Sequence, residues 1–181
     1  SMSLVKDGEV QELSEEITFD VVPLREGALD RKPDETRMAF MENLIAFQRD
    51  LSAVSNRLED AQERIGAMRA ALLRAENDDP ELQERLQAAR MRLLEFDKAM
   101  NGSDAKGQIG EKEPPTPRSR MFVGFRALGT TYGPTATHER TLEAGISELE
   151  AIRRELDDYL SSEMPALERA LEAAGAPPIE D

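Results

Sequence analysis

The sequence predicts an all-α protein, an antiparallel helical bundle of three long helices and one short helix, with a short N-terminal β segment left from a preceding domain. Three observations lead to this prediction. Apolar residues recur at alternating spacings of four and three over most of the chain, as on a buried helical face. Breaks rich in proline and glycine divide this pattern into separate helices. Residues 4–30 lack the pattern and carry a strand-like alternation instead.

The first predicted helix spans residues 34–77 and carries the longest heptad pattern. At 1.5 Å per residue it would be about 65 Å long. Its apolar stripe requires partner helices because so much apolar surface is unstable in water. Two heptad positions make up the stripe: Leu44, Leu51, Leu58, Ile65 and Leu72 fill one, and Phe40, Phe47, Val54, Ala61 and Met68 fill the other.

The second predicted helix begins at Pro80, because proline suits the first helical position and Asp79 can cap the helix. It ends at Asn101-Gly102, a common C-cap. The break between the first two helices is short, so we expect them to form an antiparallel hairpin. The buried face predicted for the second helix consists of Leu82, Leu86, Ala89, Leu93, Phe96 and Met100.

The segment that follows, at about residues 102–117, is the longest predicted loop. It is rich in glycine and proline and holds one large aliphatic residue, Ile109. We therefore expect a mobile loop without regular structure. A short third helix is expected over residues 121–128, with the apolar positions Met121, Phe122, Phe125 and Leu128.

The last long helix is expected to begin at Pro134-Thr135. Pro165 should interrupt and kink it near residues 161–163, because proline removes one backbone hydrogen bond. Gly145 lies within it, where glycine costs about 1 kcal/mol relative to alanine; close approach of another helix and an ordinary surface position both remain open as explanations. The predicted buried face is Leu142, Ile146, Leu149, Ile152, Leu156, Tyr159 and Leu160.

The N-terminal part differs in character from the helical pattern. Residues 1–3 resemble a cloning scar, and residues 4–30 are interpreted as a β-strand remnant and linker. Residues 17–22 alternate apolar and polar side chains and are rich in β-branched residues, which predicts a strand that ends at Pro23. One or two strands cannot bury a core. The segment is therefore expected to belong to a neighbouring domain, and the helical bundle domain to occupy residues 31–178.

The composition excludes several classes of function. The net charge of −14 disfavours nucleic acid and anionic membranes as partners. No apolar run of about 18 residues is present, so membrane insertion is not expected. The lack of cysteine excludes disulfides, thiol catalysis and Cys-ligated zinc. It is compatible with either the bacterial cytoplasm or the periplasm, so the compartment stays open.

No catalytic, cofactor-binding or metal-ligating residue is predicted. A di-iron site in a helical bundle needs the motif Glu-x-x-His on two helices. The only histidine is His138, and the residue three positions before it is Thr135. We therefore expect His138 to be a solvated residue of the first helical turn, and no metal or other cofactor to be bound.

Adjacent carboxylates occur three times, at Glu15-Glu16, Asp78-Asp79 and Asp157-Asp158. Glycosidases use two carboxylates that face one cleft. Neighbouring residues of a helix point about 100° apart, so Asp157 and Asp158 do not suit this role, and capping explains Asp79 better. The chain is therefore not expected to be an enzyme.

Several short segments carry a family resemblance: residues 19–24 (FDVVPL), 44–48 (LIAFQ) with the heptad helix, 133–137 (GPTAT), 163–167 (EMPAL) and 173–177 (AAGAP). Over nearly all of residues 5–178 the sequence resembles the C-terminal region of large bacterial sortilin-like β-propeller proteins classed as glycosyl hydrolases. The resemblance implies a secreted or periplasmic parent in which a propeller and an immunoglobulin-like region precede the helices. The propeller motif Ser-x-Asp-x-Gly-x-x-Thr-Trp is absent, since the chain has no tryptophan.

The function expected from these observations is that of a non-catalytic helical accessory domain, acting as a structural arm or in protein–protein association. Its expected partners are the parent's own propeller and immunoglobulin-like domains, with a homodimer also possible. Two alternatives remain: a carbohydrate-binding or hydrolytic module, and a free-standing coiled-coil adaptor. The absence of tryptophan and of paired inward carboxylates argues against the first of these.

Overall fold

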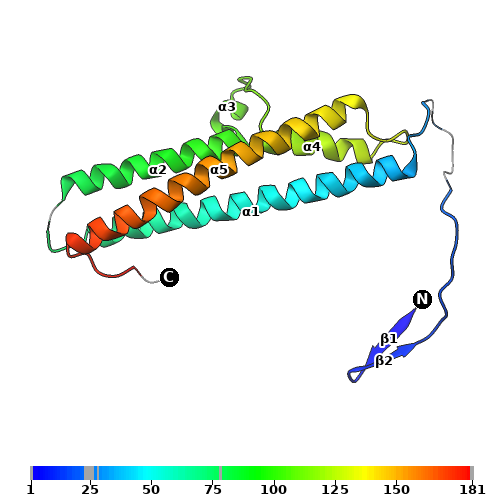
Figure 1. The fold of residues 1–181 in the computed structure, drawn as a ribbon, viewed down its shortest axis with the longest axis horizontal. Helices are drawn as coiled ribbons and strands as arrows, with labels where there is room; N and C mark the ends of the chain where they lie inside the picture. The colour runs from blue at the N-terminus through cyan, green and yellow to red at the C-terminus, as the bar shows by residue number, and fades with distance from the viewer. Residues whose placement is uncertain (1, 23–26, 28, 78, 180–181) are drawn as a thin grey trace. The chain divides into compact units, whose positions relative to one another are not determined.

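The structure is a computed structural model that describes residues 2–22, 27, 29–77 and 79–179. The chain divides into two compact units, Ser1–Asp30 and Arg31–Asp181, called here the N-terminal unit and the helical unit. The described residues are mostly helical, and a small two-stranded sheet lies in the N-terminal unit (Figure 1). None of the described helices combines the length and apolarity required to cross a bilayer.

The N-terminal unit contains an antiparallel hairpin of β1 (Ser3–Lys6) and β2 (Glu9–Glu12), in which Val5 pairs with Val10. Its two-residue turn, Asp7-Gly8, has positive φ at both positions (53° and 86°), as an Asp-Gly hairpin turn requires. The predicted strand at residues 17–22 is wrong, because those residues form neither helix nor strand. A strand needs a partner, and the turn supplies one only to the residues on either side of it.

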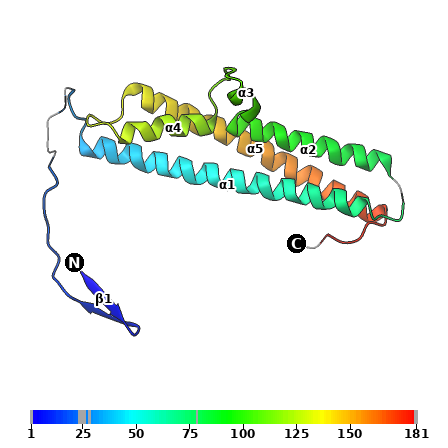
Figure 2. The same ribbon diagram turned by 180° about the vertical axis from the view of Figure 1, so that it is seen from behind.

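The helical unit contains α1 (Asp34–Leu72), α2 (Pro80–Asn101), α3 (Asp104–Gln108), α4 (Pro117–Leu128) and α5 (Ala136–Ala173). Seen from both sides, α2 and α4 lie one after the other along α1, and α5 runs beside all three (Figures 1 and 2). Backbone hydrogen bonds fix both ends: Lys32 N donates to Tyr132 O at 2.9 Å, and Asn77 N donates to Ala174 O at 3.3 Å. Thus α1 and α5 point in the same direction.

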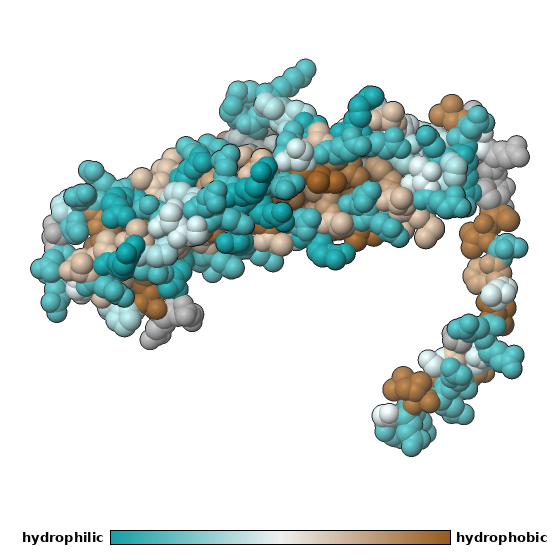
Figure 3. Space-filling view, in the orientation of Figure 1, coloured by the Kyte–Doolittle hydropathy of each residue, from teal (hydrophilic) through white to brown (hydrophobic). Residues whose placement is uncertain are grey.

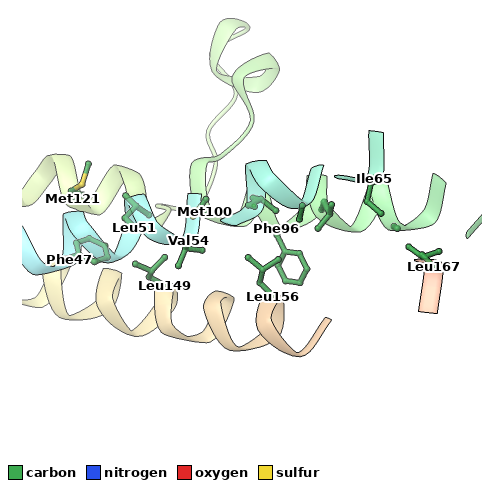
Figure 4. Packing of buried hydrophobic residues seen from close by; sticks show 14 of the residues in the cluster. Phe47, Leu51, Val54, Ile65, Phe96, Met100, Met121, Leu149, Leu156 and Leu167 are labelled. Carbon is green, nitrogen blue, oxygen red and sulfur yellow. The ribbon is translucent and has the colours of Figure 1, made fainter. Parts of the chain in front are cut away.

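The heptad register predicted for α1 is confirmed. Its nine stripe residues from Phe40 to Met68 are buried, and Leu72 is partly buried. They pack against residues of α2, α4 and α5 in one continuous core (Figure 4). The six predicted core residues of α2 are buried as well.

The helix boundaries follow their capping residues. The carboxylate of Asp79 accepts a hydrogen bond from Leu82 N at 2.9 Å, and Gly102 takes a positive φ of 86° after α2, both as predicted. In contrast, α4 begins four residues earlier than predicted. Thr116 caps it through a reciprocal pair of hydrogen bonds with Ser119, and Pro117 takes the first helical position.

The segment predicted as an unstructured loop contains the five-residue helix α3. Ser103 caps this helix through its side chain, which accepts from Lys106 N at 3.4 Å. The backbone of Ser103 donates to the carboxylate of Glu113 at 2.8 Å, which connects the two ends of the segment. The expectation of three long helices and one short one is thereby corrected to three long helices and two short ones within the described residues.

The inward face of α5 differs from the prediction at one position. Gly145 is buried, whereas Ile146 is 40% exposed. The ring of Phe47 fills the space beside Gly145 and leaves no room for a larger side chain. Gly145 is therefore explained by close approach of α1. Pro165 does not end α5, which continues through this residue to Ala173, and the kink expected near residues 161–163 stays a prediction.

The inward face of α4 also contains a glycine. Gly124 is buried, and a Cβ atom on it would lie 2.7 Å from Cδ1 of Leu44. Pro117, Met121 and Ala127 complete the buried face of this helix. Phe122, predicted as one of the apolar positions, is 55% exposed instead.

Candidate functional site

Charged contacts between helices concentrate on α5. Five of its carboxylates pair with arginines of three other helices. Arg120 of α4 donates two hydrogen bonds to the carboxylate of Glu148, both with nitrogen–oxygen distances of 2.8 Å. The remaining pairs are Arg57–Asp157 (2.7 Å), Arg64–Glu168 (2.9 Å), Arg85–Glu163 (3.2 Å) and Arg92–Glu155 (3.3 Å).

These pairs are half-exposed, so each contributes little to stability on its own. Their geometry is more informative than their energy. Because the arginines come from α1, α2 and α4 and the carboxylates from α5, the pairs constrain how each helix is aligned along α5. This arrangement suits structural charge pairing, and it leaves these carboxylates occupied rather than directed into a common cleft.

His138, the only histidine, takes part in helix capping. Its Nδ1 accepts a hydrogen bond from Thr135 N at 3.1 Å and lies 3.0 Å from Oγ1 of Thr135. Its own backbone N donates to the same hydroxyl at 3.4 Å. The prediction of a solvated residue is thus too simple, because His138 is part-buried in the reciprocal cap that begins α5.

The carboxylate pairs do not converge on a site. Glu15 and Glu16 are both exposed in a segment without regular structure. Asp78 lies outside the described residues, and Asp79 caps α2. Asp157 faces Arg57, whereas the neighbouring Asp158 is exposed.

No group of three or more His, Cys, Asp or Glu side chains in the described ranges is arranged to hold a metal ion. A surface hollow of about 550 Å³ lies at the end of α2 and is lined by Met91, Leu94, Lys98 and Arg118, among others. Its polar groups bond to one another: Arg118 donates to Asn101 at 2.5 Å, and Asn101 donates to Asp97 at 2.6 Å.

An aromatic cluster joins α2 to α5. The rings of Phe96 and Tyr159 have centroids 6.1 Å apart, and the guanidinium of Arg92 lies 4.4 Å from the centre of the Phe96 ring. Burial raises the pKa of Tyr159, and the carboxylate of Glu163 raises it further, while Arg92 acts in the opposite direction.

Apolar side chains also remain exposed on the helical unit, whose face seen in Figure 3 is otherwise largely hydrophilic. Those of interest are Met38, Met41 and Ile45 on α1 and Phe122 on α4. The sequence analysis named Phe122 as an apolar position of a short helix but did not consider Met38, Met41 or Ile45. It also did not consider that residues 117–128 hold three arginines and no acidic residue in a chain of net charge −14.

Comparison of the chain with protein-family models, curated proteins and solved structures gives no match.

Proposed function

We propose that this chain supplies a non-catalytic accessory domain to a larger protein with β-sheet domains. In this proposal the helical unit is an antiparallel bundle that acts as a structural arm or in protein–protein association. The resemblance to the C-terminal region of sortilin-like propeller proteins motivates the choice of parent. It makes the propeller and the immunoglobulin-like region the first partners to test, in a secreted or periplasmic protein.

The observation that carries the proposal is the exposed apolar segment of the N-terminal unit. Ile17, Phe19 and Val21 alternate with polar residues, and Phe19 is 80% exposed. Residues 17–22 pair with no strand, and both strands of the hairpin are exposed along their length. Because apolar side chains in such an arrangement are stable only when packed, the segment requires the sheet of another domain or chain.

The helical unit supports a structural role in a different way. Its core is continuous across α1, α2, α4 and α5, and its interhelical charges are paired. Among the described residues, no group of three or more His, Cys, Asp or Glu side chains is arranged to hold a metal ion. These features favour a rigid support over a module with chemistry of its own.

Deletion of residues 1–24 tests the proposal. The far-UV circular dichroism of the helices should persist and the melting temperature should fall only slightly, because these residues belong to a separate unit. Any dimer formed through the segment should be lost. Unfolding of the helices by the deletion would place the segment in their core and contradict the proposed boundary.

The hydrolytic alternative is tested by activity. The pure chain should not turn over aryl-glycoside or sialoside substrates. Turnover that a point substitution within this chain abolishes would favour the alternative over the accessory role.

A further inference from the structure

Residues 16–22 of the N-terminal unit have the alternation of a strand with two different faces. Successive side chains of an extended chain point to opposite sides. One face is apolar and consists of Ile17, Phe19 and Val21, which are exposed by 76%, 80% and 84%. The other face is largely polar and consists of Glu16, Thr18, Asp20 and Val22. As a strand, the segment would therefore have one side suited to a protein core and one side suited to water.

The backbone of this segment is unpaired. The hairpin before it ends with β2 at Glu12, and a bond of 2.8 Å from Leu13 N to Met2 O extends its ladder by one pair. Residues 15–22 form neither helix nor strand and pair with no strand among the described residues. Their N–H and C=O groups are thus available to the open edge of a sheet, which presents the complementary groups at the same spacing.

The charge around the segment is acidic. Residues 7–24 contain no lysine or arginine, and their carboxylates are Asp7, Glu9, Glu12, Glu15, Glu16 and Asp20. Open sheet edges in native proteins often carry lysine, which discourages pairing with other strands. Glu16 and Asp20, on the polar face of an added strand, would lie opposite such side chains, and cross-strand pairs of opposite charge are stabilising.

A second copy of the segment does not provide these partners. Pairing between two copies would give a two-stranded ribbon, which is marginally stable at best because its apolar face stays in water. Both strands would also bring carboxylates and no basic side chain. A sheet that already covers a core can instead bury the apolar face of the segment along its edge.

We propose that residues 16–22 bind by strand addition to the open edge of a partner's β-sheet, at an edge whose outward side chains are basic. The proposal rests on the accessory role proposed above and specifies how the N-terminal unit joins its partner. Ile17, Phe19 and Val21 extend the apolar layer of that sheet, and Glu16 and Asp20 pair with the basic side chains on its outer face.

The probe is a designed protein in which a helix packs on a three-stranded antiparallel sheet with one open edge, whose outward side chains are lysines. It carries a fluorescent label, and binding of the full chain is followed by anisotropy. Binding should be saturable, and Val21→Ser should weaken it about tenfold, which is the usual effect of losing one good contact. Hydrogen exchange should slow at alternate amides of residues 17–22, because only one edge of the added strand is paired.

Val22→Ser is the matched control, because it makes the same change at a neighbouring valine of similar exposure (75%) on the other face. It should bind like the unsubstituted chain. Asp20→Lys should weaken binding to the lysine probe and strengthen binding to a probe with glutamates in their place. Absence of binding, or equal effects of the two valine substitutions, would overturn the proposal. Self-association that Phe19→Ser abolishes would assign the segment to a second copy and overturn it as well.

This comparison and the deletion of residues 1–24 can fail separately. The deletion asks whether the helices fold without the N-terminal unit, and circular dichroism gives the answer without the probe. The valine substitutions change one exposed side chain each. Unfolding of the helices by the deletion contradicts the accessory role, whereas intact helices with equal binding of the two valine variants contradict strand addition alone.

Discussion

Gly145 of α5 lies so close to the ring of Phe47 that a Cβ atom at position 145 would be 2.9 Å from Cζ of the ring. The same Cβ would be 3.2 Å from Cβ of Arg120 on α4. Phe47 is almost fully buried, and its ring lies among the other core side chains. The glycine therefore determines how closely α5 approaches both α1 and α4.

Gly145→Ala should destabilise the protein by about 1 kcal/mol. Alanine gains about 1 kcal/mol of helix propensity over glycine, but overpacking of a filled core costs typically 1–3 kcal/mol, and here the cost should exceed the gain. Urea denaturation followed by circular dichroism measures the difference.

Gly66→Ala is the control for this prediction. A Cβ atom at position 66 would have no neighbour within 4 Å, so this substitution should stabilise the protein by up to about 1 kcal/mol. Adding Phe47→Leu to Gly145→Ala should remove part of the overpacking, so the two changes should be less than additive. Stabilisation by Gly145→Ala alone would show that the helices separate easily.

Reversing the charge of Arg120 should destabilise the protein more than reversing an unpaired surface arginine. Arg120→Glu replaces a double contact with Glu148 by repulsion, and we expect a loss of about 1–2 kcal/mol. Adding Glu148→Arg should recover most of it. Arg90→Glu on the exposed face of α2 is the control. Equal effects of the two single reversals would mean that the pair does not contribute to the alignment of α4 with α5.

Limited digestion with trypsin should cut the segment between α2 and α4 first. Residues 105–115 are all exposed and include Lys106 and Lys112. Lys106 pairs with Glu111 and Glu113 within the same segment, so Lys112 should be the faster site. The two fragments should stay associated, because the core crosses the cut. First cuts within residues 34–72 would contradict the stability assigned to α1.

Tyr159 should titrate above the usual tyrosine pKa of about 10. The chain has two tyrosines, so absorbance near 295 nm in a Tyr132→Phe variant reports Tyr159 alone. Glu163→Gln should lower the midpoint, because it removes a carboxylate that opposes the phenolate. Arg92→Gln should raise the midpoint, because it removes a cation that favours it.

The raised pKa of Tyr159 also determines in which direction the stability of the fold changes with pH. The folded protein holds the phenolic proton more tightly than the unfolded chain, so this contribution is fully present below about pH 10. It is lost as the pH rises through the folded-state pKa. In a Tyr159→Phe variant, the part of the stability loss at alkaline pH that comes from ionisation of Tyr159 should be absent. Midpoints that do not move in opposite directions in the Glu163→Gln and Arg92→Gln variants would refute the assigned causes.

The long helices could be predicted from the sequence because their signals are local. The alternation that places Leu44, Leu51 and Leu58 inward is a property of one helix, and any partner buries the same side. The inward position of Gly145 in place of Ile146 could not be predicted, since both fit the spacing. The bulk of Phe47, almost a hundred residues earlier in the chain, decides between them.

The N-terminal prediction failed for a different reason. Residues 17–22 have the alternating, β-branched side chains typical of a strand, but a strand forms only where a neighbouring strand can pair with it. Asp7-Gly8 is a strong hairpin signal in the sequence, and it was overlooked because its flanking strands are short and polar. The exposure of Phe122 likewise depends on which side of α4 meets α1, and the local pattern of Phe122, Phe125 and Leu128 does not contain that information.

The chain passes along the helical unit three times, once as α1, once as α2 followed by α4, and once as α5 (Figures 1 and 2). An odd number of passes brings the chain in at one end and out at the other. With 39 residues in α1, these ends are about 58 Å apart. The helical unit thus has the geometry of a spacer, and groups attached near residues 31 and 173 would be held apart by its length. One added heptad in each pass would increase that separation by about 10 Å.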